Sequence, residues 1–213
     1  MKQEHDILKY AEEHSSSEPD ILKELNRETH VKMLYPRMLS GHMQGRLLSM
    51  ISCMIHPEKI LETGTFTGYS AICLAEGLKE NGMLHCIEIN PEYEEIIKKY
   101  IDKSNLAQKV MLHIGDARNI IPGLNEMFDL VFIDADKEQY LEYYKIVFDT
   151  VKPGGFILAD NALWDGKVLK KGKGIDKETQ GIKEFNDFVQ QDSRVEKFLL
   201  PFRDGLMIIR KIS

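Results

Sequence analysis

Two short apolar runs, each ending abruptly in acid, constrain the fold of this chain more than any other feature. The first lies within residues 129–137 and leads into Asp134, and the second lies within residues 157–161 and ends in Asp160 and Asn161. Apolar runs of this length are typical of fully buried strands in a parallel sheet. Ligands of open α/β sheets collect at the carboxyl ends of such strands, so we expect the three polar side chains to converge.

These three side chains supply hard oxygen donors, two carboxylates and one amide. Such a set suits Mg²⁺, or Ca²⁺ or Mn²⁺ in its place, better than zinc, and it leaves coordination positions for substrate oxygens. The sequence therefore predicts a divalent-metal site formed by Asp134, Asp160 and Asn161.

From residue 59 onward, strand and helix signals alternate along the chain. Strands are expected at residues 59–63, 83–89, 110–114, 130–134, 156–160, 195–200 and 206–210. Helices are expected at residues 69–80, 91–104, 117–124, 137–150 and 177–190, and the Lys-Pro-Gly-Gly segment 152–155 is expected to be a turn. This alternation predicts an α/β fold, a Rossmann-like, doubly wound, mostly parallel seven-stranded sheet with helices on both faces.

The first 56 residues are expected to form an N-terminal helical extension, with candidate helices at residues 7–14 and 20–33. Residues 57–213 would form the α/β core, and we treat the whole chain, 1–213, as one domain because no shift in composition divides it. In the N-terminal extension, four large apolar side chains recur at helical spacing: Met43, Leu47, Met50 and Met54. We interpret them as a stripe that packs in the core or contacts a second subunit, and the second possibility favours a homodimer.

Composition excludes several classes of function. The formal charge of −6 disfavours a broad nucleic-acid footprint, which needs clustered Lys and Arg. The start of the chain lacks the apolar core of a secretion signal, and no apolar run approaches the ~20 residues that cross a bilayer. Three cysteines stand singly in apolar surroundings and are expected to be buried free thiols, namely Cys53, Cys73 and Cys86. We therefore expect a cytoplasmic protein.

Three successive strand ends suggest a nucleoside pocket. Gly64 and Gly68 follow the first strand and allow a tight turn close to a ligand, although their spacing matches neither a dinucleotide fingerprint nor a P-loop. Glu88 ends the second strand, where it could accept ribose hydroxyls or merely favour the start of the next helix. Asp116 ends the third strand, where it could meet an adenine amino group or cap the following helix. Gly, Glu and Asp together specify adenosine without a diphosphate cradle.

Four motifs occur in the same order as in a known family. They are Glu62-x-Gly64-Thr-x-x-Gly68-Tyr-Ser70, Phe132-Ile-Asp134-Ala-Asp136-Lys137, Asp160-Asn161-x-Leu-Trp164-x-Gly166 and Asp204-Gly205-Leu206. From about Met38 onward the chain resembles the class I S-adenosylmethionine-dependent methyltransferases, and among them the cation-dependent O-methyltransferases of catechol and caffeoyl-CoA type. The chain departs from the family pattern at residues 40–45, which read Ser-Gly-His-Met-Gln-Gly, so cofactor contacts from that helix start are open.

The resemblance implies a role for each matching residue. It assigns Asp134, Asp160 and Asn161 to the metal, and it places Asp134 against the cofactor as well. Glu88 would take the ribose and Glu62 the methionine end of S-adenosylmethionine, with Gly64, Ser70, Asp116 and Ala117 completing the cofactor site. Lys137 would remove the proton of a phenolic acceptor, although a helix-start lysine paired with Asp136 or Glu138 is the simpler alternative. Trp164, the single tryptophan, would form an aromatic wall against a planar acceptor or fill the core.

The acceptor itself stays open at this point. A divalent-metal-dependent O-methyltransferase of small catechol-like molecules is the leading hypothesis. The basic segment Lys167–Lys177 also fits phosphates, so a tRNA 5-hydroxyuridine O-methyltransferase is the alternative. An NAD-dependent oxidoreductase is disfavoured by the glycine spacing, and a noncatalytic cofactor-binding module by the filled catalytic positions.

Overall fold

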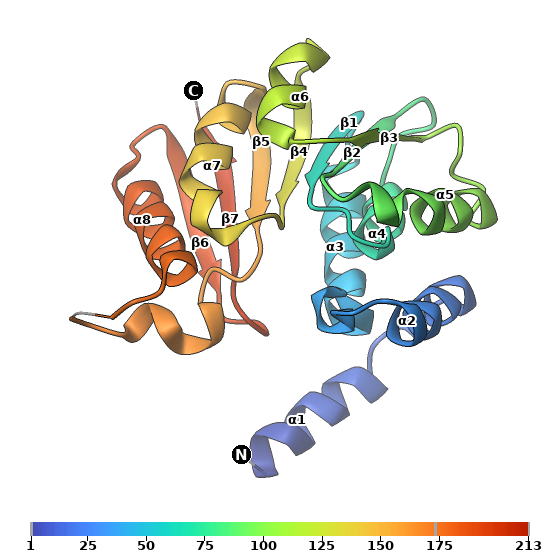
Figure 1. The fold of residues 1–213 in the computed structure, drawn as a ribbon, viewed down its shortest axis with the longest axis horizontal. Helices are drawn as coiled ribbons and strands as arrows, with labels where there is room; N and C mark the ends of the chain where they lie inside the picture. Colours follow the sequence, from blue (N-terminus) through green and yellow to red (C-terminus); the bar gives the residue numbers. More distant parts are fainter. Residues whose placement is uncertain (1, 173, 213) are drawn as a thin grey trace.

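A seven-stranded sheet forms the centre of the molecule (Figure 1). The computed structural model describes residues 2–172 and 174–212, with side chains from residue 6 onward. The strands are β1 (Lys59–Thr63), β2 (Met83–Glu88), β3 (Val110–Ile114), β4 (Phe128–Ile133), β5 (Val151–Ala159), β6 (Val195–Leu200) and β7 (Leu206–Lys211). Their order is β3-β2-β1-β4-β5-β7-β6, and all pairs are parallel except those of β7 with β5 and β6. The prediction of a mostly parallel, doubly wound sheet is confirmed.

Helices cover both faces of this sheet. One face packs against α2 (Asp20–Lys32), α3 (Gly41–Ile55), α4 (Tyr69–Ala75) and α5 (Glu94–Lys103). The other packs against α6 (Ala117–Leu124), α7 (Tyr140–Phe148) and α8 (Lys177–Gln191). The first helix, α1 (Lys2–Glu13), lies at the edge of the fold in Figure 1. No helix in the described residues is both long and apolar enough to cross a membrane.

Strand β4 shows why its sequence is apolar without alternation. Leu130 and Phe132 are fully buried in the core on one face, while Val131 and Ile133 are fully buried in the core on the other. A strand covered on both sides needs apolar residues at every position, since burial of each such side chain contributes ~1.5–3 kcal/mol. The run that leads to Asp134 is therefore a central strand, as its sequence predicts.

Strand order reverses beside β1, and the chain comes very close to itself there. Gly64 follows β1 with a φ of +86°, and a Cβ at this position would lie 2.1 Å from the carbonyl oxygen of Asp134. Glycine is therefore required both by the backbone conformation and by the space. This contact brings the ends of β1 and β4 together at the point where α/β sheets bind ligands.

Several predicted boundaries are wrong. The helix expected at 69–80 ends at Ala75, and a Cβ on Gly77 would meet the Ser52 backbone at 2.2 Å, so the chain leaves the helix to pass α3. The segments expected as helices 91–104 and 137–150 each begin with a 3₁₀ turn, Pro91–Tyr93 and Lys137–Gln139. Segment 152–155 is part of β5 rather than a separate turn, with an irregular register opposite β4.

Helix α3 buries a different face from the one its methionines suggested. Its buried residues are Gln44, Gly45, Leu48, Ser49 and Ser52. Met50 and Met54 are 59% and 71% exposed, so the core interpretation of the stripe is wrong for both. Cys53 is also exposed, contrary to prediction, because it lies three residues after exposed Met50 and thus on the same uncovered side of the helix.

Candidate active site

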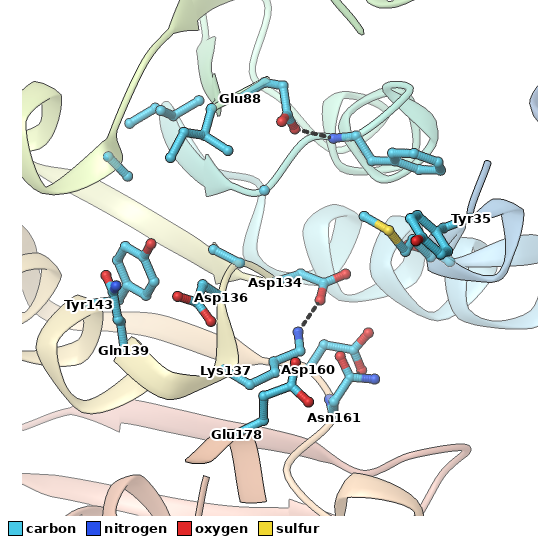
Figure 2. Close-up of a pocket in the computed structure, with 18 of the residues that line it drawn as sticks. Tyr35, Glu88, Asp134, Asp136, Lys137, Gln139, Tyr143, Asp160, Asn161 and Glu178 are labelled. Atoms are coloured by element: carbon cyan, nitrogen blue, oxygen red, sulfur yellow. Dashed lines mark hydrogen bonds and ion pairs between the residues drawn. The ribbon is translucent and has the colours of Figure 1, made fainter. Parts of the chain in front are cut away.

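A cavity of about 640 Å³ opens at the carboxyl ends of β1, β2, β3, β4 and β5. Eight of the predicted site residues line it: Gly64, Glu88, Ala117, Asp134, Lys137, Asp160, Asn161 and Trp164. Figure 2 shows Asp134, Lys137, Asp160 and Asn161 gathered together, with Glu88 across the cavity from them. Three others, Glu62, Ser70 and Asp116, lie outside its lining. A volume of this size is typical of sites for small molecules and cofactors.

Asp134 lines the cavity, and the pKa of its carboxyl group is strongly raised. Burial raises the pKa of Asp134 to about 6, the Lys137 ammonium opposes this rise, and the negative charge of Asp160 adds to it. Lys137 Nζ donates to Asp134 Oδ1 at 2.6 Å and to the Tyr140 hydroxyl at 2.7 Å. The simpler prediction for Lys137, a pair with Asp136 or Glu138, is wrong, because Asp136 instead caps the 3₁₀ turn by accepting from the Glu138 N–H.

Asp160 and Asn161 follow β5 and are held from several directions. Asp160 Oδ2 accepts from Gln44 Nε2 at 2.6 Å, and Oδ1 accepts from the Asn161 N–H at 2.8 Å. Asn161 has a left-handed φ of +55°, which asparagine tolerates better than most residues. Its Nδ2 donates to Asp204 Oδ2 at 3.2 Å. The Asn161 bond to Asp204 therefore uses the amide nitrogen and not the amide oxygen, which is the atom that would ligate a metal.

The donor set fits a hard dication. Asp160 lies close enough to Asp134 for its negative charge to raise the pKa of Asp134, and a bound cation would relieve this repulsion. The described residues contain no group of three or more His, Cys, Asp or Glu side chains placed around a metal position. The predicted site has only two carboxylates, and its third donor is the amide oxygen of Asn161. All three donors are oxygens, which are the ligands that Mg²⁺ prefers.

Glu62 stands apart as a buried acid at the end of β1. It is fully buried, and neither of its carboxylate oxygens has a hydrogen-bond partner among the described residues. Burial raises the pKa of Glu62 to about 7, against a smaller opposing effect of the Ser70 hydroxyl. A buried carboxyl group that no donor satisfies costs free energy, so a ligand donor that reached Glu62 would stabilise it, although Glu62 lies behind the cavity lining.

Asp116 makes the local contact that was its simpler alternative, whereas Glu88 bonds to the backbone just after its own strand and to the turn after β1. Glu88 accepts from the Phe66 N–H at 2.7 Å and from the Asn90 N–H at 2.8 Å, while it still lines the cavity. Asp116 caps α6 by accepting from the Arg118 N–H at 2.9 Å, and it pairs with the Arg118 guanidinium. Each oxygen of Glu88 keeps a second lone pair, so a ribose contact remains compatible with its backbone bonds.

Trp164 lies in a tightly turned segment beside the cavity. The 3₁₀ stretch Trp164–Leu169 contains left-handed residues, with φ of +47° at Trp164 and +52° at Asp165. The indole Nε1 is buried without a partner among the described residues, and Lys167 Nζ lies 4.8 Å from the ring centroid. The basic segment Lys167–Lys177 thus begins within a 3₁₀ stretch, and Lys173 within it lies outside the described residues.

Four site residues escaped prediction as functional side chains: Gln44, Tyr140, Arg203 and Asp204. Tyr140 is fully buried, which raises its pKa well above the ordinary value and keeps its hydroxyl protonated next to Lys137. Arg203 and Asp204 lie on the β6–β7 turn, and Gln44 lies on α3. Asp204 belongs to a recognised motif and Gln44 to the segment 40–45 whose contacts stayed open, whereas Arg203 lies in no pattern that sequence alone could have used.

Comparison with known proteins gives the class of this fold and site. The O-methyltransferase TomG from Streptomyces achromogenes, solved in complex with SAM, superposes with a TM-score of 0.92 at 27% identity, covering 100% of both chains. An O-methyltransferase from Bacillus cereus, solved with SAH, gives a TM-score of 0.89 at 27% identity over 95% of this chain and 96% of the other. The fold is that of the class I methyltransferases.

The sequence comparisons identify the family. The O-methyltransferase family model matches residues 12–212. Caffeoyl-CoA O-methyltransferase 1 from Nicotiana tabacum is 36% identical over 92% of this chain and 86% of its own length, and the enzyme from Petroselinum crispum is 33% identical over the same shares. The chain belongs to the S-adenosylmethionine-dependent O-methyltransferase family, which confirms the resemblance and the assignment as an enzyme.

Proposed function

We propose that this enzyme is a divalent-metal-dependent O-methyltransferase that moves the methyl group of S-adenosylmethionine to a hydroxyl of a small, catechol-like acceptor. One observation carries the proposal: Asp134, Lys137, Asp160 and Asn161 meet on the wall of a single cavity that also contains Glu88 and Ala117. A cofactor half and an oxygen-donor half thus share one space of about 640 Å³. The caffeoyl-CoA O-methyltransferase relatives support a small phenolic acceptor.

S-adenosylmethionine supplies the methyl group in this proposal, and the residues of the first three strand ends bind it. Glu62 takes the amino group and gives up its buried proton in doing so, since neither of its oxygens is bonded to another described residue. Glu88 takes the ribose, Gly64 and Ala117 line the same cavity, and Ser70 stands beside Glu62 behind that lining. Asp116 acts as a helix cap that shapes the adenine end, since its carboxylate is already bound to Arg118.

Asp134, Asp160 and Asn161 would hold the metal ion. A bound Mg²⁺, or Ca²⁺ or Mn²⁺ in its place, would lower the pKa of an acceptor hydroxyl and orient two vicinal oxygens. Lys137 first releases one ammonium proton to solvent, and its neutral Nζ, held in place by Asp134 and the Tyr140 hydroxyl, then takes the acceptor's proton. Trp164 lies against the planar face of the acceptor and excludes water from it.

The experiment that tests this proposal is a radiolabelled methyl-transfer screen with catechols, caffeoyl-CoA-type thioesters and bulk tRNA, each with and without a chelator. We expect transfer to a small vicinal diol that the chelator abolishes and added Mg²⁺ restores. Transfer that survives the chelator would refute the metal requirement. Transfer to tRNA alone, with a steep salt dependence, would establish the alternative acceptor, which the relatives do not favour.

We further propose that the enzyme is a single-domain protein that acts in the cytoplasm as a homodimer. Exposed Met50 and Met54 on α3 support the subunit contact, since large apolar side chains clustered on a surface mark interaction sites. Analytical ultracentrifugation of the intact chain and of a Met50→Lys, Met54→Lys variant tests this. We expect a dimer that the double substitution dissociates.

A further inference from the structure

A buried amide joins the start of α3 to the tip of β5. Gln44 is 4% exposed and lies in the first turn of α3, more than a hundred residues before Asp160 in the chain. Its Nε2 donates to Asp160 Oδ2 at 2.6 Å. Its Oε1 accepts from the Arg203 guanidinium, which also donates to the backbone carbonyl of Ser40 just before the helix. Three separate parts of the fold therefore meet at one side chain.

The two partners of Gln44 fix which way its amide faces. A guanidinium can only donate, and an ionised carboxylate can only accept. Gln44 must therefore turn its oxygen to Arg203 and its NH₂ to Asp160, because the opposite orientation would oppose donor to donor and acceptor to acceptor. Neither a glutamate nor a lysine at this position could satisfy both neighbours in the same way.

Both oxygens of Asp160 are consequently oriented from within the protein. Oδ2 is held by Gln44 and Oδ1 by the Asn161 N–H at 2.8 Å. Each oxygen retains a lone pair for a further partner. Hydrogen bonds of this kind orient the carboxylates that ligate metals, and their loss commonly weakens metal binding.

We infer that Gln44, itself oriented by Arg203, is a positioning residue that holds the Asp160 carboxylate ready for the metal ion. This inference rests on the proposed function, since it presupposes that Asp160 is a metal ligand. The start of α3 thus contacts the metal side of the cavity through Gln44. Arg203 lies near enough to lower the pKa of Asp134 as well, so its guanidinium belongs to the same charged cluster.

The test compares Gln44→Met with wild type. Methionine keeps the length and most of the volume of glutamine but can neither donate to Asp160 nor accept well from Arg203. Binding of Mn²⁺ to the full-length protein, followed by the electron paramagnetic resonance signal of the free ion, gives a readout independent of turnover. We expect the dissociation constant to rise ~10–100-fold, the usual cost of removing such a partner of a ligand.

Two further measurements separate positioning from a general structural role. Affinity for S-adenosylmethionine, measured by calorimetry, should be unchanged in Gln44→Met. In assays with an active acceptor, the KM for Mg²⁺ should rise by the same factor while kcat at saturating Mg²⁺ changes much less. Gln44→Asn retains an amide on a side chain one methylene shorter, cannot reach both partners, and should weaken Mn²⁺ binding in the same way.

Gln139→Met provides the matched control. Gln139 lines the same cavity, but it lies beside Tyr143 in Figure 2 and away from Asp160, and its Oε1 has no partner among the described residues. The same chemical change there should leave Mn²⁺ affinity at the wild-type value. Circular dichroism and thermal unfolding identify any variant that fails to fold, and Gln44→Asn then replaces Gln44→Met.

The outcomes distinguish this inference from the proposed function. Weakened Mn²⁺ binding confined to the Gln44 variants, with cofactor affinity retained, supports the positioning role. Wild-type Mn²⁺ affinity in folded Gln44→Met and Gln44→Asn overturns it and leaves the proposed function standing. A wild-type protein that binds no Mn²⁺ at all overturns both.

Discussion

Replacing Glu62 with glutamine tests whether a buried proton stabilises the cofactor-free enzyme. The change keeps the shape of the side chain and removes its titration. Burial raises the pKa of Glu62 from 4.5 to about 7, and this rise of about 2.5 at ~1.36 kcal/mol per pH unit is worth ~3 kcal/mol. Glu62 is fully buried, so solvent does not screen the effect.

The sign follows from the direction of the shift. Because the folded pKa lies above the unfolded one, the native state keeps a proton that the unfolded state has lost between pH 4.5 and about 7. This contribution to the free energy of unfolding is complete below pH 4.5 and is lost as the pH rises through about 7. Wild type should therefore lose ~3 kcal/mol relative to Glu62→Gln between about pH 5 and about pH 8.

Urea unfolding of both proteins across this pH range measures the difference between their free energies of unfolding. The contributions of the other titrating groups largely cancel in this difference. A difference that stays constant with pH would refute the reasoning and show that Glu62 is ionised throughout. Cofactor binding provides a second readout. If Glu62 receives the amino group of S-adenosylmethionine, binding near neutral pH should release a proton, measurable by calorimetry in buffers of different ionisation enthalpy, and Glu62→Gln should abolish that release.

Three other substitutions test separate parts of the site. Lys137→Met should slow methyl transfer most at low pH, where an unassisted phenolate is scarce, and a pH-rate profile parallel to wild type would remove the base role. Glu88→Gln should raise the dissociation constant of S-adenosylmethionine ~10-fold through loss of a charged hydrogen-bond acceptor, with unchanged affinity counting against the ribose contact. Gly64→Ala should lower the free energy of unfolding by more than ~3 kcal/mol because its Cβ would overlap the Asp134 carbonyl, whereas Gly123→Ala, inside α6 with open space around it, should not destabilise the protein. Equal stability of the two glycine variants in urea would contradict the close approach.

The sheet was predictable because its central strands are buried on both faces. The run before Asp134 is apolar at every position, and this pattern has few other interpretations at such a length. Helix ends were less predictable, since they depend on contacts with distant parts of the chain. Helix α4 ends early because Gly77 passes against the backbone of Ser52, and no local signal around residues 75–80 reports that contact.

The site was predictable where function depends on strand ends and not where it depends on packing between elements. Asp134, Asp160 and Asn161 follow strands directly, so topology alone brings them together. Gln44 is a different case, because its importance comes from partners more than a hundred residues away. Exposed Met50 likewise resembles a core residue in sequence, and only the packing of α3 shows which side of the helix is covered.

Strand β7 runs antiparallel between β5 and β6, and this places the turn at residues 201–205 beside the end of β5. Arg203 and Asp204 on that turn hold Gln44 and Asn161, which come from much earlier in the chain. During synthesis the polar wall of the cavity consequently stays unfinished until residues 201–205 have left the ribosome. A nascent chain halted before this turn has its central strands yet lacks the contacts that orient its oxygen donors, so competence for catalysis comes after folding of the sheet.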